Sequence, residues 1–256
     1  MTKYTKDYLR VSQTVFGQGA ISPGGLEELK EILSGVDLAG KSVVDIGCGL
    51  GGFTVMLAAE FAASVVEGHD VVPLLVEEAV KLVNARKLEE NVECKLVPAD
   101  GSIASPDQRF DIVFSKDSII HIPNRGEFYK EVFRVLKPGG MFVASDWLRT
   151  EGIESEKMQV WRKESGQPAP MATLPETEMF LTAAGFGSCE FRDRNNWYAS
   201  HIPTELAAVE KALAEEPMSD YVRNLFEERL VASNLKFDLV KSGEHRPTHV
   251  RATKPH

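Results

Sequence analysis

A glycine-rich turn near the start of the chain constrains the fold more than any other feature. The apolar run 42–46 ends in the turn G-C-G-L-G-G at 47–52, and helix-forming residues follow directly. Gly47, Gly49 and Gly51 lack a Cβ, so the backbone can come close to a bound ligand. The helix behind the turn presents free N–H groups to the same crevice. The sequence therefore predicts a nucleotide-type pocket at the end of the first strand.

The identity of the nucleotide depends on three acidic residues. The turn matches the dinucleotide motif G-x-G-x-x-G, and Asp70 follows at close to the ~20-residue spacing of a ribose-binding acid. Asp45, however, lies inside the strand. Its negative charge would attract the cationic end of a ligand and repel a pyrophosphate. Asp100, in the A-D-G segment 99–101 after the third strand, offers an acceptor for an adenine amino group. These two acids favour S-adenosylmethionine over a nicotinamide dinucleotide.

Two later segments carry a family resemblance. F-D-I-V-F-S at 110–115 resembles the fourth strand of the class I methyltransferases, and F-R-V-L-K-P-G-G at 133–140 resembles their junction into the fifth strand. The resemblance covers roughly 38–146, with all signatures in order. It implies a Rossmann-like α/β domain that binds S-adenosylmethionine and transfers its methyl group; a dehydrogenase is the alternative.

The order of elements agrees with this fold class. Strands alternate with helices, which predicts a doubly wound, mostly parallel sheet with helices on both faces. We expect a single domain over 1–256, with an N-terminal helical cap (1–33), a cofactor-binding core (38–146) and a C-terminal part (147–256) of substrate lid helices and last strands. The cap, 4–33, has one expected break at 23–25 and then a helix at 26–33, and the loop 165–170 is expected to be a mobile lid. The expected strands are 42–46, 64–70, 92–97, 111–115, 141–145, 187–192 and 249–253, and the other expected helices are 52–61, 72–86, 125–136, 154–164, 176–184, 204–215 and 219–230.

Composition narrows the possible partners. The chain has 256 residues and a net charge of −9, which disfavours nucleic acid and suits an amine substrate. No apolar run approaches the ~20 residues of a membrane span, and the start of the chain is not a signal peptide. Cys48, Cys94 and Cys189 show no metal-ligand spacing and are expected to be reduced thiols. We therefore expect a cytoplasmic protein, monomeric or weakly homo-oligomeric, without a metal.

The N-terminal segments narrow the family further. Y-T at 4–5, V-F-G at 15–17, I-S-P-G-G-L-E at 21–27, S-K-D-S-I-I-H-I at 115–122 and V-R-A-T-K at 250–254 resemble the phosphoethanolamine (phosphobase) N-methyltransferases. These enzymes, like the related sarcosine/dimethylglycine N-methyltransferases, methylate small amines. The resemblance implies that Tyr4 and His121 form a catalytic pair that closes the site. Including neighbouring positions, the expected donor-binding residues are Ile21, Ser22, Asp45, Gly47, Gly49, Gly51, Asp70, Val71, Asp100, Gly101, Ser115 and Asp117.

The chemistry of methyl transfer supports these roles independently. The reaction is an in-line displacement at a sulfonium carbon, so positioning of the nucleophile dominates catalysis. An ammonium has no lone pair, and a histidine such as His121 is suited to remove its proton. A tyrosine hydroxyl could orient the imidazole. Asp117, four residues before His121, could fix the imidazole tautomer or bind the cationic donor or substrate.

The acceptor site departs from the family pattern. Trp147 stands where the phosphobase enzymes have a tyrosine, and Arg162 is the arginine near a segment, 164–169, that lacks the family's arginine and tyrosine. Lys236 matches the family's lysine. A phosphate dianion needs several charge-assisted donors, whereas tryptophan suits a methylated ammonium. We expect these three residues to bind the acceptor, either a phosphate-free amine of the sarcosine/dimethylglycine type or phosphoethanolamine and its methylated forms; methyl transfer to oxygen or carbon, or a non-catalytic nucleotide-binding protein, are the alternatives.

Overall fold

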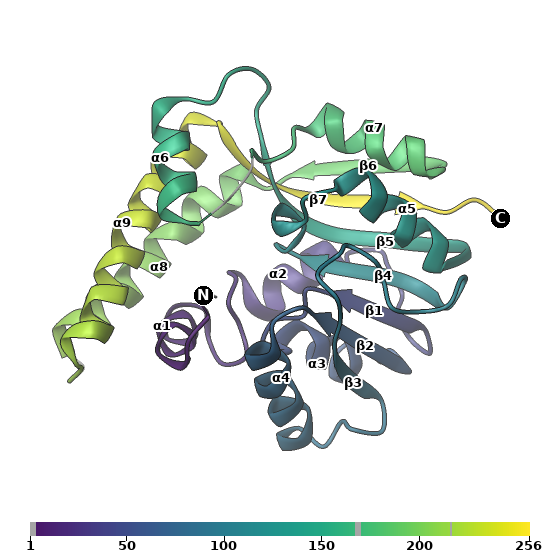
Figure 1. Cartoon of the computed structure of the whole chain (residues 1–256), viewed down its shortest axis with the longest axis horizontal. Helices are drawn as coiled ribbons and strands as arrows, with labels where there is room; N and C mark the ends of the chain where they lie inside the picture. The colour runs from purple at the N-terminus through teal and green to yellow at the C-terminus, as the bar shows by residue number, and fades with distance from the viewer. Residues whose placement is uncertain (1–3, 167–169, 216) are drawn as a thin grey trace.

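A seven-stranded sheet lies at the centre of the computed structural model, which describes residues 4–166, 170–215 and 217–256 (Figure 1). The strand order is β3-β2-β1-β4-β5-β7-β6, and only β7 runs antiparallel to its neighbours. The doubly wound, mostly parallel sheet is thereby confirmed. The strands are β1 (Ser42–Ile46), β2 (Val65–Asp70), β3 (Val92–Leu96), β4 (Phe110–Lys116), β5 (Leu136–Arg149), β6 (Ser188–Asp193) and β7 (His245–Thr253).

Both faces of the sheet are covered by helices. In β1, Val43 packs into an apolar cluster with α2 (Gly25–Ile32), α3 (Gly52–Ala59) and α4 (Pro73–Ala85). Its neighbour Val44 packs into the opposite cluster, with α5 (Arg125–Val135) and α7 (Leu174–Ala184). Successive strand residues point to opposite faces, so a central strand buried on both faces reads as the continuous apolar run seen in the sequence.

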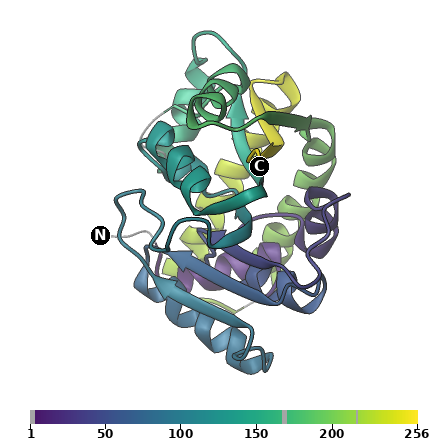
Figure 2. The same ribbon diagram turned by 90° about the vertical axis from the view of Figure 1, so that its right-hand side faces the viewer.

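A further group of helices stands beside the sheet. These helices are α1 (Lys6–Phe16), α6 (Glu156–Glu164), α8 (Asn195–Glu215) and α9 (Asp220–Ser242). Helices α1 and α6 both pack against the helix pair α8–α9 (Figure 1). The end of the chain after β7 points away from α1 (Figures 1 and 2). Helix α1 from the start of the chain therefore lies in one layer with α8 and α9, which follow much later in the sequence.

Several of the expected boundaries were wrong. The cap does not break only at 23–25: α1 ends at Phe16, and Gly17 and Gly19 turn the chain with positive φ angles of 93° and 76°. Helix α8 begins at Asn195 rather than 204 and continues through Pro203, because the fully buried Tyr198 and Ile202 hold the preceding turns in place. Proline normally favours the first turn of a helix, which explains the late expected start.

The third correction concerns the end of the chain. Helix α9 runs to Ser242 rather than 230. Strand β5 begins at Leu136, which pairs with Phe110 of β4, and β5 and β7 extend further than expected because they pair along Met141–Arg149 and His245–Thr253. The remaining boundaries differ by one or two residues, which is the usual uncertainty of helix and strand ends. The expected lid loop falls partly on 167–169, which lie outside the described residues.

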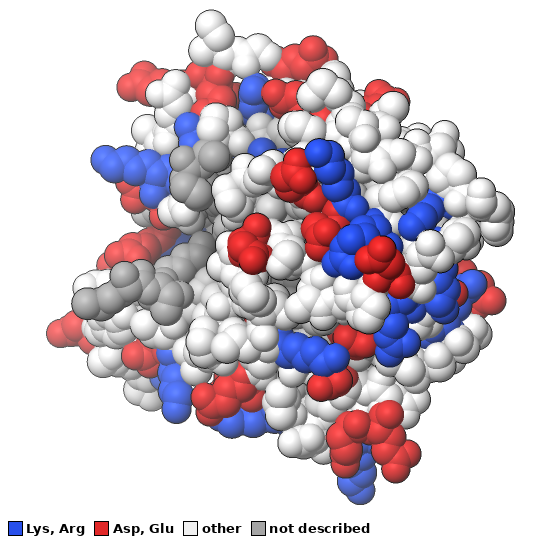
Figure 3. Space-filling view, turned by 45° about the vertical axis from the view of Figure 1, so that its right-hand side comes forward, with Lys and Arg blue, Asp and Glu red and all other residues white. Residues whose placement is uncertain are grey.

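The surface and the helices set limits on partners. On the face seen in Figure 3, basic and acidic side chains are interleaved rather than separated into patches. Within the described ranges, no helix is both long and apolar enough for a membrane span. The same residues contain no group of three histidine, cysteine, aspartate or glutamate side chains placed to hold a metal.

Candidate active site

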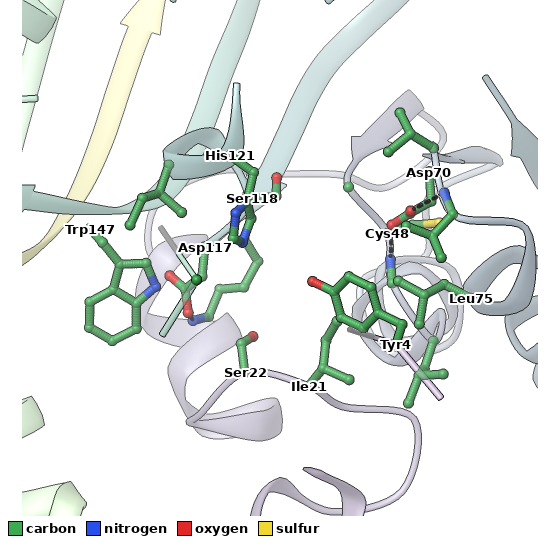
Figure 4. Close-up of a pocket in the computed structure, with 18 of the residues that line it drawn as sticks. Tyr4, Ile21, Ser22, Cys48, Asp70, Leu75, Asp117, Ser118, His121 and Trp147 are labelled. Carbon is green, nitrogen blue, oxygen red and sulfur yellow. Dashed lines mark hydrogen bonds and ion pairs between the residues drawn. The ribbon is translucent and has the colours of Figure 1, made fainter. Parts of the chain in front are cut away.

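A cavity of about 970 Å³ opens at the carboxyl ends of β1, β2 and β4 and is covered by α1 and α9. Its size is at the upper end of the usual range for small-molecule sites, roughly 300–1,000 Å³. Figure 4 shows Asp70 at one end, Asp117, His121 and Trp147 at the other, and Tyr4 between them. The cavity brings together most of the residues expected from the sequence: Tyr4, Ile21, Ser22, Asp45, Gly47, Gly49, Asp70, Val71, Gly101, Asp117, His121, Trp147 and Lys236.

The glycine loop is shaped by close contacts that leave no room for side chains. A Cβ on Gly47 would lie 2.4 Å from the side chain of Ser118, and this glycine has a φ of 74°. The amide of Gly52 donates a 3.0 Å hydrogen bond to the carbonyl of Gly19. This bond connects the segment that contains Ile21 to the glycine loop. The Cδ1 atom of Ile21 would lie 3.1 Å from a Cβ on Gly49. The N-terminal segment therefore forms one wall of the cavity.

Two buried acids lie at the ends of neighbouring strands. Asp45 accepts a 2.7 Å hydrogen bond from Thr54, and burial raises the pKa of its carboxyl to about 7. Asp70 accepts 2.9 Å bonds from the amides of Gly49 and Val72. Burial raises the pKa of Asp70 as well, while these backbone donors oppose the shift. Each oxygen of a carboxylate can accept more than one hydrogen bond, so Asp70 can still receive the hydroxyls of a sugar.

Two other expected donor ligands have structural roles in the loops around them. Gly51 does not line the cavity; it adopts a φ of 79° before α3, and a Cβ there would lie 3.0 Å from Ala79. Ser115 is buried behind the lining, where its hydroxyl bonds Ile46 at 2.9 Å and Ser118 at 2.8 Å.

Asp100 also lies outside the lining. Its exposed carboxylate accepts bonds of 2.9 and 2.6 Å from the amide and hydroxyl of Ser102, which lower its pKa. Its neighbours Ala99 and Gly101 line the cavity. Both bonds to the Asp100 carboxylate go to the same oxygen, Oδ1. The loop therefore reaches the site, and the expected contact of Asp100 with an adenine amino group stays a prediction.

The turn after β4 carries two of the expected catalytic residues. Asp117 has a φ of 55°, rare for a residue with a Cβ, and its side chain is only 4% exposed. Its carboxylate is held by an ion pair with Lys116 and by a 2.8 Å bond from the hydroxyl of Ser145. His121 ends the short 3₁₀ helix that follows and is exposed to the cavity. The contacts that fix Asp117 thus come from Lys116 and Ser145, and its effect on the imidazole stays a prediction.

Tyr4 reaches the same space from the other side. Its ring packs edge-on against Tyr8 at 5.6 Å, and its hydroxyl points into the cavity (Figure 4). Burial raises its pKa, with smaller contributions from Tyr8 and Asp70. The hydroxyl therefore keeps its proton at neutral pH and can donate a hydrogen bond. Its direct contact with His121 stays a prediction.

The acceptor residues divide into two groups. The ammonium of Lys236 lies 5.4 Å from the ring centre of Trp147 and 3.5 Å from Glu205, and burial lowers its pKa. Both Lys236 and Trp147 line the cavity. Arg162 does not: its guanidinium forms 2.9 Å contacts with Glu154. The expected contact of Arg162 with the acceptor therefore stays a prediction that the lining of the cavity does not support.

The sequence interpretation missed several lining residues. Lys116 lies inside the recognised S-K-D-S segment but was given no role, although it is only 7% exposed. Arg229 lay at the edge of a helix that was expected to stop at 230, so its inward direction could not be inferred. A helical pattern continued to 242 would have placed Arg229 and Lys236 on one side of α9.

Comparisons with known proteins agree with the fold. Residues 44–144 match the family model described as a methyltransferase domain. The chain therefore has the class I methyltransferase fold.

Several relatives of the chain are phosphoethanolamine N-methyltransferases. The enzyme of Triticum aestivum is 32% identical over 91% of this chain, which spans 45% of that protein. The enzyme of Plasmodium falciparum is 26% identical over 90% of this chain and 84% of its own length. Phosphoethanolamine N-methyltransferase 2 of Haemonchus contortus, solved with phosphomonomethylethanolamine and S-adenosylhomocysteine, has a TM-score of 0.89 and 25% identity over 100% of this chain and 59% of that one. The chain thus spans about half the length of the plant relatives.

Proposed function

We propose that the chain transfers the methyl group of S-adenosylmethionine to the nitrogen of phosphoethanolamine or of its methylated forms. The observation that carries the proposal is one cavity with a nucleoside-type end at Asp45 and Asp70 and a polar end at His121. The identity of the acceptor is inferred from the relatives, which are named phosphoethanolamine N-methyltransferases.

The residues of the first end fit the donor. Because Gly47 and Gly49 have no side chains, the ligand can approach the backbone of the loop directly. The carboxylate oxygens of Asp70 lie beside the loop, where they can accept hydrogen bonds from a ribose diol. Asp45 lies deep in the cavity, where its carboxylate is costly to ionise until a cation approaches it. The donor carries an ammonium and a sulfonium, so its binding would stabilise the charged form of this acid.

The second end supplies the means to prepare the acceptor. When bound, the donor offers an electrophilic methyl group on a sulfonium centre. His121 takes a proton from the acceptor ammonium, which frees the nitrogen lone pair; the N–C bond then forms as the C–S bond breaks. Tyr4 donates a hydrogen bond within the site and excludes water. Asp117, neutralised by Lys116, holds the turn that carries His121.

A phosphorylated acceptor suits the charges better than the phosphate-free amine that the sequence left open. Lys236 and Arg229 both reach the cavity from α9 although the chain is acidic overall. Among the described residues, the carboxylate of Glu205 pairs with Lys236, and Arg229 has no carboxylate partner, so an anion would be stabilised there. The likeness to a sarcosine dimethylglycine methyltransferase of Galdieria sulphuraria, at 20% identity and a TM-score of 0.77, concerns the fold alone.

A steady-state assay with a substrate panel tests the proposal. Methyl transfer from labelled S-adenosylmethionine is measured for phosphoethanolamine, sarcosine, dimethylglycine and ethanolamine, with Asp70→Ala as the donor-site control. We expect kcat/KM to be highest for phosphoethanolamine. Preference for sarcosine or dimethylglycine would replace the acceptor, and transfer to a hydroxyl compound instead would replace the reaction type.

A further inference from the structure

The cations that line the cavity differ in their partners. Lys116 forms an ion pair with Asp117, and Lys236 lies 3.5 Å from Glu205. Lys163 stands exposed at the end of α6. Arg229 alone among the half-buried cations of this lining has no carboxylate partner within the parts of the chain that the structure describes. A guanidinium that faces a cavity without an anion is poised to receive one from solution.

The neighbours of Arg229 are neutral. Its Nη2 donates to the hydroxyls of Tyr8 at 3.3 Å and Ser12 at 3.1 Å. The rings of Tyr8 and Phe16 lie 5.5 and 5.4 Å from its guanidinium carbon. These contacts orient the planar group and leave its charge uncompensated, because hydroxyls and rings do not neutralise a cation.

Helix α9 places this arginine in line with a second cation. Arg229, Ser233 and Lys236 follow one another at the i, i+4 and i+7 positions of one helix face, and all three line the cavity. Ser233 is only 2% exposed. Burial lowers the pKa of Lys236, and the positive charge of Arg229 acts in the same direction. Two like charges with a hydroxyl between them form a site that an anion would stabilise.

We propose that Arg229 binds the phosphate of the acceptor together with Lys236 and Ser233, and that it sets the preference for a phosphorylated amine. The inference rests on the proposed function and names the part of the cavity that recognises its acceptor. A guanidinium offers two parallel N–H groups to a phosphate, which lysine cannot do. Because Arg229 comes from α9 and not from the 164–169 segment, the missing arginine of that segment does not exclude a phosphate.

The competing explanation is that Arg229 only fastens α1 to α9 through Tyr8 and Ser12. Both explanations predict a loss of turnover in Arg229→Gln, so activity alone does not separate them. The discriminating quantity is the preference for phosphoethanolamine over ethanolamine, which differ by the phosphate. A fastening role would weaken both acceptors equally.

Calorimetry on the protein loaded with S-adenosylhomocysteine provides the direct test. We expect Arg229→Gln to weaken phosphoethanolamine binding by about 10–100-fold and to leave ethanolamine and S-adenosylhomocysteine affinities within about twofold. Arg229→Lys should retain part of the binding. The matched control is Arg223→Gln on the same helix, whose guanidinium reaches the carbonyl of Leu213 at 3.4 Å and does not line the cavity.

A second variant tests the fastening role. Tyr8→Phe combined with Ser12→Ala removes both hydroxyl contacts and keeps the charge, so the preference for phosphoethanolamine should persist. The inference is overturned if this double variant loses the preference as Arg229→Gln does, or if Arg229→Gln binds phosphoethanolamine like the wild type. If phosphoethanolamine binds through Arg229 but no methyl group is transferred, the proposed reaction fails while the phosphate site stands.

Discussion

The amide of Gly49 donates a 2.9 Å hydrogen bond to Oδ2 of Asp70, so that the carboxylate at the end of β2 holds the loop at the end of β1. Asp70 therefore has two functions that a single substitution removes together. It fixes the shape of the glycine loop, and it faces the cavity as a charged acceptor.

A comparison of two replacements of Asp70 should separate these functions. Asp70→Ala loses both, and donor affinity should fall by about 1.5–3 kcal/mol for each hydrogen bond to the charged group. Asp70→Asn keeps an oxygen for Gly49 but not the charge, and its loss should be smaller. Calorimetry with S-adenosylmethionine measures both. Unchanged affinity in Asp70→Ala, or tight binding of a nicotinamide dinucleotide to the wild type, would overturn the assignment of the nucleoside end.

The raised pKa of Asp45 predicts that stability depends on pH. With a pKa of about 7 in the folded state and about 4 when unfolded, the folded protein binds the extra proton between these values. Stability therefore falls as pH rises from about 4 to 7. Asp45→Asn should raise the free energy of unfolding by about 1–4 kcal/mol at pH 8 and by less at pH 5, while it abolishes donor binding.

Denaturant unfolding at the two pH values measures this difference. The exposed Asp37→Asn, which caps the amide of Ala39, is the control and should show no such dependence. Equal stabilisation of Asp45→Asn at pH 5 and pH 8 would mean that the carboxylate is already ionised without the donor.

The role of His121 can be measured through the pH dependence of a variant. His121→Ala should lower kcat by about 10²–10⁴-fold if proton removal is part of the step. The defect should shrink as pH rises toward the pKa of the acceptor amine, because the amine then loses its proton unaided. A loss of only a few-fold, constant with pH, would leave His121 a positioning role.

Gly52 tests the contact between the glycine loop and the N-terminal segment. A Cβ at this position would lie 2.4 Å from the carbonyl oxygen of Gly19. Gly52→Ala should therefore displace the wall at Ile21 and Ser22, weaken donor binding at least fivefold, and cost about 1–3 kcal/mol of stability. Calorimetry and denaturant unfolding measure the two effects.

The control for this substitution is another helical glycine. A Cβ on Gly126 in α5 would make only ordinary van der Waals contacts, the nearest of them with Phe180 at 3.6 Å. Gly126→Ala should stabilise the protein by about 0.5–1 kcal/mol through helix propensity. Unimpaired donor binding in Gly52→Ala would show that the N-terminal wall is not needed at the nucleoside end.

The sequence predicted those parts of the fold that local patterns determine. The apolar run before Gly47 and the acids Asp45 and Asp70 placed the glycine loop correctly, because strand, turn and helix are adjacent in the chain. Asp100 followed the same logic but lies outside the cavity lining, where a serine two residues later binds its carboxylate. Such a turn depends on side-chain rotation, which spacing does not reveal.

The acceptor end could be predicted less well because distant segments build it. Arg229 meets Tyr8 across more than two hundred residues of sequence, and no periodicity relates the two. Arg162 was expected to bind the acceptor because it is close in sequence to the segment 164–169. It pairs instead with Glu154 and does not line the cavity. The start of α8 was predicted too late because proline usually lies in the first turn of a helix. In this helix the burial of Tyr198 and Ile202 outweighs that preference.

The meeting of α1 with α8 and α9 has a consequence for biosynthesis. The strands that carry Asp45 and Asp70 leave the ribosome early and can pair with β4 while the rest of the protein is still being translated. The side chains of Arg229 and Lys236 follow more than 150 residues after Asp70. The strands and the loop of the nucleoside end can therefore form before α9, which lines the other end of the cavity, has been synthesised.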